Sequence, residues 1–294
     1  MHGHMQFADF VVSEALRLNT RCLQAVGAQR VPLAELREDV ERLASLWQMM
    51  QWSIGKPAYK SGRARTDRAA RLLDAEPDWV AHALVEIGRK LTSDDRAWLS
   101  ARAEPLFLDG GPEAAPLSPE LVDELDELFQ ADSAVWRDDA SLRQVKDADL
   151  IEYGIVRAYG KAQRASGRYL EERSDKRSAR ARRWLGHCVH HMELLQPVLS
   201  DTSKTQLWYL QRLRANLQKQ QLIAQFVDLA QMKLKPKTVS RIEELAGRRV
   251  ARLQRRAGKL CERGFAQSPK AFAGRARKAV RKLHLQEVVL LPTG

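Results

Sequence analysis

The chain has 294 residues, of which 44% are apolar, so it can bury a core and is not disordered throughout. It carries 49 Lys and Arg against 37 Asp and Glu, a net charge of +12, which favours a polyanionic partner such as nucleic acid, an anionic membrane or a phosphate polymer. No apolar run approaches the ~20 residues that a membrane-spanning helix needs.

Apolar residues recur every three or four positions, which is typical of amphipathic helices, and no alternating β-branched run predicts a sheet. We therefore expect an all-α protein. Pro77 should break or kink the helical segment in which it falls. The predicted helices cover residues 6–26, 33–54, 66–90, 94–103, 119–130, 148–170, 175–199, 203–232, 238–265 and 270–284.

The sequence contains two clear helix-start signals and one linker between the predicted helices. Ser118-Pro119 and Ser268-Pro269 each pair an N-cap residue with proline at the first helical position. Gly110-Gly111-Pro112, followed by Pro116, is the clearest linker. We expect two parts that meet within 104–147.

Charge is divided unequally between the two halves. Residues 151–294 have a net charge of +20 and residues 1–150 a net charge of −8, with 13 acids and 3 bases in 104–150. The acidic helix with Asp123, Glu124, Asp126 and Glu127 is interpreted as solvated or as a shield for a basic groove, with catalytic carboxylates as the alternative.

Two predicted helices of the basic half carry cations at helical spacing. In helix 175–199, Leu185, Cys188 and Met192 share one side, and the opposite side is cationic. Such faces side by side would line a groove with Arg and Lys, and arginine matches phosphate oxygens in pairs. The anion-binding candidates on these helices are Lys176, Arg180, Arg183 and His187 in the first and Arg248, Arg252, Arg255, Arg256, Lys259 and Arg263 in the second.

Histidines cluster on the first basic helix. His187 and His190 fall on its cationic face, so their protonation near pH 6 is expected to strengthen anion binding. His187 and His191 have the i,i+4 spacing of helical zinc ligands, but no Glu follows His187 and Cys188 faces the apolar side. We expect no metal site.

Several segments carry a resemblance to a known family. Gly154–Arg164, Arg182-Arg183-Trp184 and Met192–Pro197 resemble the second half of the CHAD domain, the conserved histidine α-helical domain. Ala246-Gly247 and the basic helix down to Phe265 and Ala271-Phe272 resemble its C-terminal end, and Leu36–Leu46 resembles its first motif. Leu36–Leu43 also resembles Ala181–Leu185, and Arg37 and Arg182 lie 145 residues apart, which suggests two related halves.

The resemblance implies two antiparallel four-helix bundles with internal pseudo-two-fold symmetry, at 1–130 (with an acidic linker from about 104) and 131–294, together one domain. It also implies a basic groove between them that binds inorganic polyphosphate without catalysis. The positions that match the family's basic sites are Arg37, Arg42, Lys161, Arg164, Arg182 and Arg183. The chain departs from the family where Ala34 and Ala179 stand at the two histidine positions, Gly186 at a basic one and Gln221 near an acidic one.

The sequence thus favours a non-enzymatic, cytoplasmic polyphosphate-binding protein, with association to polyphosphate granules as a further expectation and no cofactor. Aromatic residues are only 6%, as expected if there are no bases to stack on, and Trp47, Trp52, Trp184 and Trp208 are expected in the core or at the bundle interface. No phosphate-binding glycine loop or nucleophile elbow is present.

The alternatives are a nucleic-acid-associated protein and a metal-dependent phosphohydrolase. The three distant cysteines fit a reducing compartment.

Overall fold

The computed structural model describes residues 6–28, 33–74, 79–103, 106 and 117–290, and over these ranges it is helical, with no strand. No helix among these residues is both long and apolar enough to cross a membrane. In chain order the elements are α1 (Phe7–Gly27), α2 (Leu33–Met50), α3 (Lys56–Asp74), α4 (Trp79–Gly88), α5 (Ser93–Ala103), α6 (Pro119–Asp138), the 3₁₀ turn η2 (Ala140–Leu142), α7 (Asp147–Asp149), the π-helix η3 (Leu150–Val156), α8 (Arg157–Glu171), α9 (Asp175–Leu194), the 3₁₀ turn η4 (Gln196–Val198), α10 (Asp201–Lys233), α11 (Pro236–Gly264) and α12 (Pro269–Leu290).

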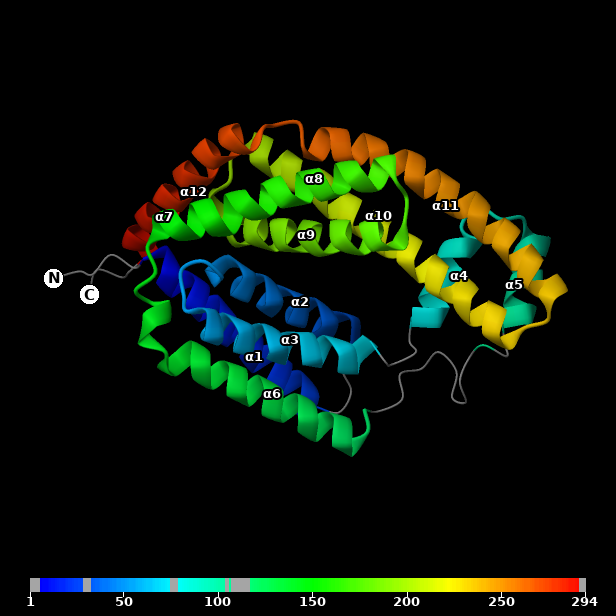
Figure 1. The fold of residues 1–294 in the computed structure, drawn as a ribbon, viewed down its shortest axis with the longest axis horizontal. Helices are drawn as coiled ribbons and strands as arrows, with labels where there is room; N and C mark the ends of the chain where they lie inside the picture. The colour runs from blue at the N-terminus through cyan, green and yellow to red at the C-terminus, as the bar shows by residue number, and fades with distance from the viewer. Residues whose placement is uncertain (1–5, 29–32, 75–78, 104–105, 107–116, 291–294) are drawn as a thin grey trace.

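Helices α1, α2, α3 and α6 pack together and are called the N-terminal group (Figure 1). Its core holds Trp47 and Trp136, whose ring centroids are 4.3 Å apart. A Cβ at Gly62 of α3 would lie 2.3 Å from the Trp47 ring. Only glycine therefore lets α3 approach α2 this closely.

A buried carboxylate joins the four helices of this group. Asp132 of α6 accepts hydrogen bonds from the indole N–H of Trp47 at 3.0 Å and from that of Trp136 at 3.0 Å. It also accepts one from Arg65 Nε at 3.0 Å and one from Asn19 Nδ2 at 3.2 Å. All its donors come from α1, α2, α3 and α6, so this network fixes their mutual register.

Helices α8 to α12 form the C-terminal group, in which α8 pairs with α9 and α10 pairs with α11 (Figure 1). The Tyr159 ring is stacked on Phe272 at 4.1 Å and meets the edge of Phe265 at 5.3 Å. The long helices α10 and α11 extend past the group, and α4 and α5 pack near their far ends around a second core that includes Ile87 and Phe226. This part is called the distal lobe.

The two groups meet along α2 and α9, and the end of α2 also packs against η3. Gly154 of η3 allows this second contact, because a Cβ there would lie 2.6 Å from Met49 Cγ and 3.1 Å from the Met49 carbonyl oxygen. The close crossing brings the α2–α3 connection next to the start of α8.

The predicted all-α class and both capped helix starts are confirmed. Ser118 Oγ accepts the Leu121 N–H at 3.3 Å before Pro119, and Ser268 Oγ accepts the Ala271 N–H at 3.3 Å before Pro269.

The predicted helix 66–90 is wrong, because α3 already begins at Lys56 and ends at Asp74, and α4 starts at Trp79. Pro57 lies in the first turn, where proline is tolerated, and Gly62 is retained for packing rather than as a break. The expected break at Pro77 and the linker with Gly110–Pro112 and Pro116 lie outside the described residues. The expected boundary at residue 130 falls inside α6, which packs on α1 and α3.

Candidate functional site

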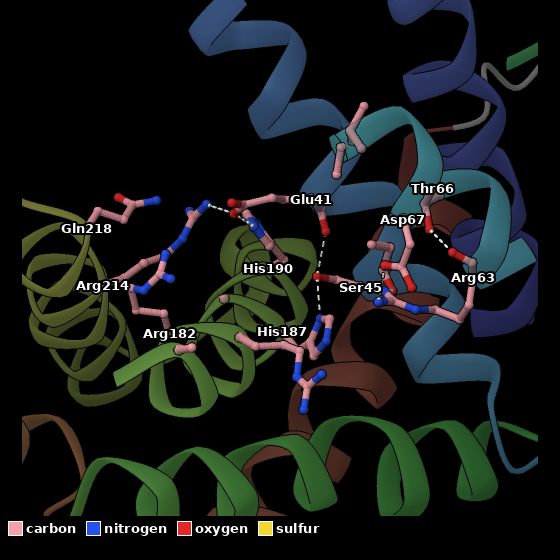
Figure 2. Close-up of a pocket in the computed structure, with 16 residues that line it drawn as sticks. Glu41, Ser45, Arg63, Thr66, Asp67, Arg182, His187, His190, Arg214 and Gln218 are labelled. Atoms are coloured by element: carbon pink, nitrogen blue, oxygen red, sulfur yellow. Dashed lines mark hydrogen bonds and ion pairs between the residues drawn. The ribbon is translucent and has the colours of Figure 1, made fainter. Parts of the chain in front are cut away.

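A pocket of about 220 Å³ lies between the two groups, with α2 and α3 on one side and α9 and α10 on the other (Figure 2). Ala179 and Gly186 of α9 line it where the resemblance would place larger polar side chains. Its charged or titratable lining residues are Glu41, Arg63, Asp67, Arg182, Arg183, His187, His190 and Arg214.

Arg214 of α10 connects the two groups at one end of the pocket. Its Nη1 donates to Glu38 Oε1 at 2.9 Å and its Nη2 to Glu38 Oε2 at 2.6 Å, and Nη2 also bonds Glu41. Figure 2 shows the guanidinium of Arg214 turned toward Glu41. Partial burial opposes ionisation of Glu41, but its bond to His190 and the charge of Arg214 lower the pKa of this carboxyl to about 2.

The pocket's other cations differ in their partners. Arg63 of α3 donates to Asp67 at 2.6 Å and to the Ala44 carbonyl at 3.0 Å. Arg183 makes no ion pair within the described part of the chain. Its positive charge is therefore available to an anion, whereas those of Arg63 and Arg214 are partly matched by carboxylates.

The expected titration of His187 is wrong. Its ring is buried, and burial first, then nearby Arg63 and His191, hold its pKa well below the ordinary value. Its Nδ1 lies 2.8 Å from Ser45 Oγ, which itself donates to the Glu41 carbonyl, so His187 Nδ1–H is the donor. The cationic stripe of α9 therefore ends where α9 enters the contact with α2, and His187 remains neutral there.

His190 lies within a mixed charge cluster. Its Nδ1 is 3.1 Å from Glu193 and 3.8 Å from Glu38, and these three groups could in principle ligate a cation. Arg214 holds both oxygens of Glu38, and Arg42 lies 3.5 Å from Glu38 and 3.9 Å from Glu193. Because two guanidinium groups already supply the positive charge, the residues do not fit a divalent metal.

A second cationic feature lies on α8 and α9, and we name it the cation cluster: Arg157, Lys161, Arg164, Arg180 and Arg183. Partial burial first, and then these four guanidinium groups, lower the pKa of Lys161. No member forms an ion pair with a carboxylate among the residues that the structure describes. Five like charges thus lie together without an internal counter-charge.

Two tryptophans hold cations of this cluster. The guanidinium of Arg157 lies 4.5 Å from the Trp52 ring centroid, and the Lys161 ammonium lies 4.1 Å from that of Trp184. Trp184 is partly buried against the core. The expected burial of Trp52 and Trp208 is wrong, since they are 53% and 45% exposed.

The structure separates the predicted site residues. Arg182, Arg183 and His187 line the pocket, and Lys161, Arg164 and Arg180 belong to the cation cluster. Lys176 is exposed on the first turn of α9.

Two predicted residues are engaged within the protein. Arg37 donates to the Leu73 carbonyl at 2.6 Å. Arg42 lies near the carboxylates of Glu38, Asp39 and Glu193.

The predicted cations of α11 lie elsewhere. Arg248 pairs with Glu244, and Arg263 donates to the Tyr209 hydroxyl at 3.1 Å. The four remaining cations, Arg252, Arg255, Arg256 and Lys259, are exposed, and among the described residues α11 adds nothing to the pocket wall.

Sequence reasoning missed Arg157, Arg63 and Arg214. The signal for Arg157 was present, because it lies four residues before Lys161 and thus on the same helix face. Arg214 had no such signal, since its partner Glu38 is 176 positions away.

Comparisons of this chain with protein-family models, curated proteins and solved structures found no match.

Proposed function

We propose that this chain is a divergent CHAD-like protein that binds inorganic polyphosphate without catalysis. In this proposal α1, α2, α3 and α6 form one antiparallel bundle and α8 to α11 the other, related by a pseudo-two-fold axis. The polyphosphate lies along the cation cluster and the Arg182 and Arg183 side of the pocket. The protein is cytoplasmic and associates with polyphosphate granules.

The positions of the two similar segments support this arrangement. Leu36–Leu43 lies on α2 and Ala181–Leu185 lies on α9, and these helices contact each other where the groups meet. If the two halves are related by a pseudo-two-fold axis, the equivalent helices α2 and α9 are expected to pack against each other beside that axis.

The single observation that carries the function is the cation cluster. Like charges on a rigid helix surface repel one another unless an anion is bound, and here no described carboxylate supplies the counter-charge. Polyphosphate has about one charge per phosphate and no base edge, so fixed cations are sufficient to hold it, with counterion release driving affinity. Arg37, Arg42 and Arg248 are left out because groups of the protein already engage them.

A binding titration with long-chain polyphosphate at several salt concentrations tests the proposal. The variant Arg164→Glu/Arg180→Glu reverses two exposed members of the cluster, and Lys233→Glu/Lys235→Glu, where α10 ends and α11 begins, is the matched control. We expect the first variant to bind at least tenfold more weakly at low salt, with a salt slope reduced by about two, and the control to bind like the unmodified chain.

Absence of polyphosphate binding by the unmodified chain at low salt would reject the function. If both variants lost polyphosphate affinity to the same extent, only the net charge of the protein would matter, and the proposed site would be rejected. Displacement of polyphosphate by duplex DNA at equal phosphate concentration would favour the nucleic-acid alternative.

A further inference from the structure

We propose that the cation cluster and Trp52 form a binding site for a nucleoside polyphosphate, whose base stacks on the Trp52 ring and whose phosphates lie among Arg157, Lys161 and Arg180. This proposal rests on the proposed function in that the same cations hold the phosphates. It goes further because it assigns a ligand with an aromatic base.

The first step of the argument is the position of Trp52. It follows the end of α2, and the close crossing of Met49 over Gly154 places it beside the start of α8. There its ring holds the Arg157 guanidinium at 4.5 Å, yet 53% of the residue remains exposed. The solvent-exposed indole of Trp52, beside a cluster of cations that can hold phosphates, is a surface on which a base can stack.

The second step is charge. Arg157 connects Trp52 to the cluster, because its guanidinium lies 4.5 Å from the Trp52 ring centroid and its charge also lowers the pKa of Lys161. The triphosphate of a nucleotide carries about four negative charges near neutral pH, which the five cations can match. Inorganic polyphosphate would use these cations but would leave the ring unused.

The third step is the number of aromatic surfaces. Proteins that bind single strands offer successive aromatic platforms. Trp184, the other tryptophan that contacts the cluster, is partly buried, and the Lys161 ammonium lies 4.1 Å from its ring centroid. Among the described residues, Trp52 is the exposed one of the two tryptophans that contact cations of the cluster, and one such ring suits one base, so a mononucleotide fits better than a strand.

Calorimetric titration of the full chain with ATP and with inorganic tripolyphosphate tests the site. Trp52→Ala removes the platform, and Trp208→Ala is the matched control, since Trp208 is 45% exposed and carries Arg212 at 4.0 Å but lies on α10. We expect Trp52→Ala to weaken ATP binding about tenfold and tripolyphosphate binding less than twofold. Trp208→Ala should change neither, and Trp52→Phe should retain most of the ATP affinity.

An equal loss of both probes in Trp52→Ala would mean that Trp52 only orients Arg157, and the proposal would be overturned. The proposal would also be overturned if Trp208→Ala weakened ATP binding as much as Trp52→Ala does. It would likewise be overturned if a single-stranded oligonucleotide bound more tightly than ATP and that binding depended on both Trp52 and Trp208. Failure of the proposed function is separate: if long-chain polyphosphate does not bind but Trp52→Ala selectively weakens ATP, the nucleotide site stands and the polyphosphate function falls.

Discussion

At the scale of single residues, Asp132 shows how a buried charge is retained. It lies in an apolar core, where burial raises the pKa of a carboxyl, and the positive charge of Arg65 and the donors Asn19 and Trp47 oppose that rise. With Trp136 these donors satisfy both oxygens. The carboxylate is therefore a structural centre of the N-terminal group.

Replacing Asp132 with Asn should destabilise the protein by about 3 kcal/mol, because an amide turns N–H groups toward donors and leaves Arg65 without its counter-charge. Urea unfolding measures this loss. The control is Asp123→Asn on the exposed side of α6, which should change the free energy of unfolding by less than about 0.5 kcal/mol. Equal effects in the two variants would contradict the role given to Asp132.

At the scale of elements, the contact between α2 and α9 is built around Ser45. His187 donates to its hydroxyl, and His191 Nε2 lies 2.8 Å from its carbonyl oxygen. Burial lowers the pKa of His191 to about 4 and that of His187 well below its ordinary value. Both rings are therefore neutral donors in the folded protein.

This contact predicts a pH dependence of stability. Because the folded-state pKa values lie below the unfolded value of about 6.5, the unfolded chain binds more protons as pH falls, and stability declines from pH 6.5 toward 4. The slope should approach about 1.4 kcal/mol per pH unit for each histidine. Unfolding of His187→Asn/His191→Gln, which keeps both donors without titration, should show a flatter profile between pH 6.5 and 4.5. An unchanged profile would show that other groups cause the decline.

At the scale of the whole molecule, two surfaces compete as anion sites: the pocket together with the cation cluster, which share Arg183, and the exposed face of α11. Each has a carboxylate that pairs with arginines, Glu41 with Arg214 in the pocket and Glu244 with Arg241 and Arg248 on α11. Neutralising Glu41 makes the net charge of the pocket more positive, whereas neutralising Glu244 does so only on α11. Comparing the two variants can therefore locate the bound polyanion.

Glu41→Gln should tighten polyphosphate binding severalfold at low salt, because Arg214 then has one counter-charge fewer, and Glu244→Gln should leave it unchanged. Titration of the two variants side by side with the unmodified chain provides the comparison. The opposite pattern, with tighter binding only in Glu244→Gln, would move the site to α11.

Much of the fold and part of the candidate site could be predicted. The Ser118 and Ser268 caps and the helical period are local signals, and the structure follows them. The start of α3 could not be predicted, because glycine has a low helix propensity and Gly62 therefore argues against a helix at this point. The structure keeps Gly62 inside α3 because any larger residue would clash with the Trp47 ring. Among the site residues, Lys161, Arg164 and Arg180 were found from their helix faces or from the family resemblance.

The sequence by itself determined that this protein is helical, where several helices begin, and that α9 and α11 each carry a cationic face. Only the tertiary structure decided which part of each face stays open. It buried the α9 face at His187 against Ser45, paired Arg214 with a carboxylate 176 positions away, and set Trp52 beside Arg157. Periodicity reports only the angle of a residue around its own helix, whereas ion pairing and exposure depend on which other helix lies opposite.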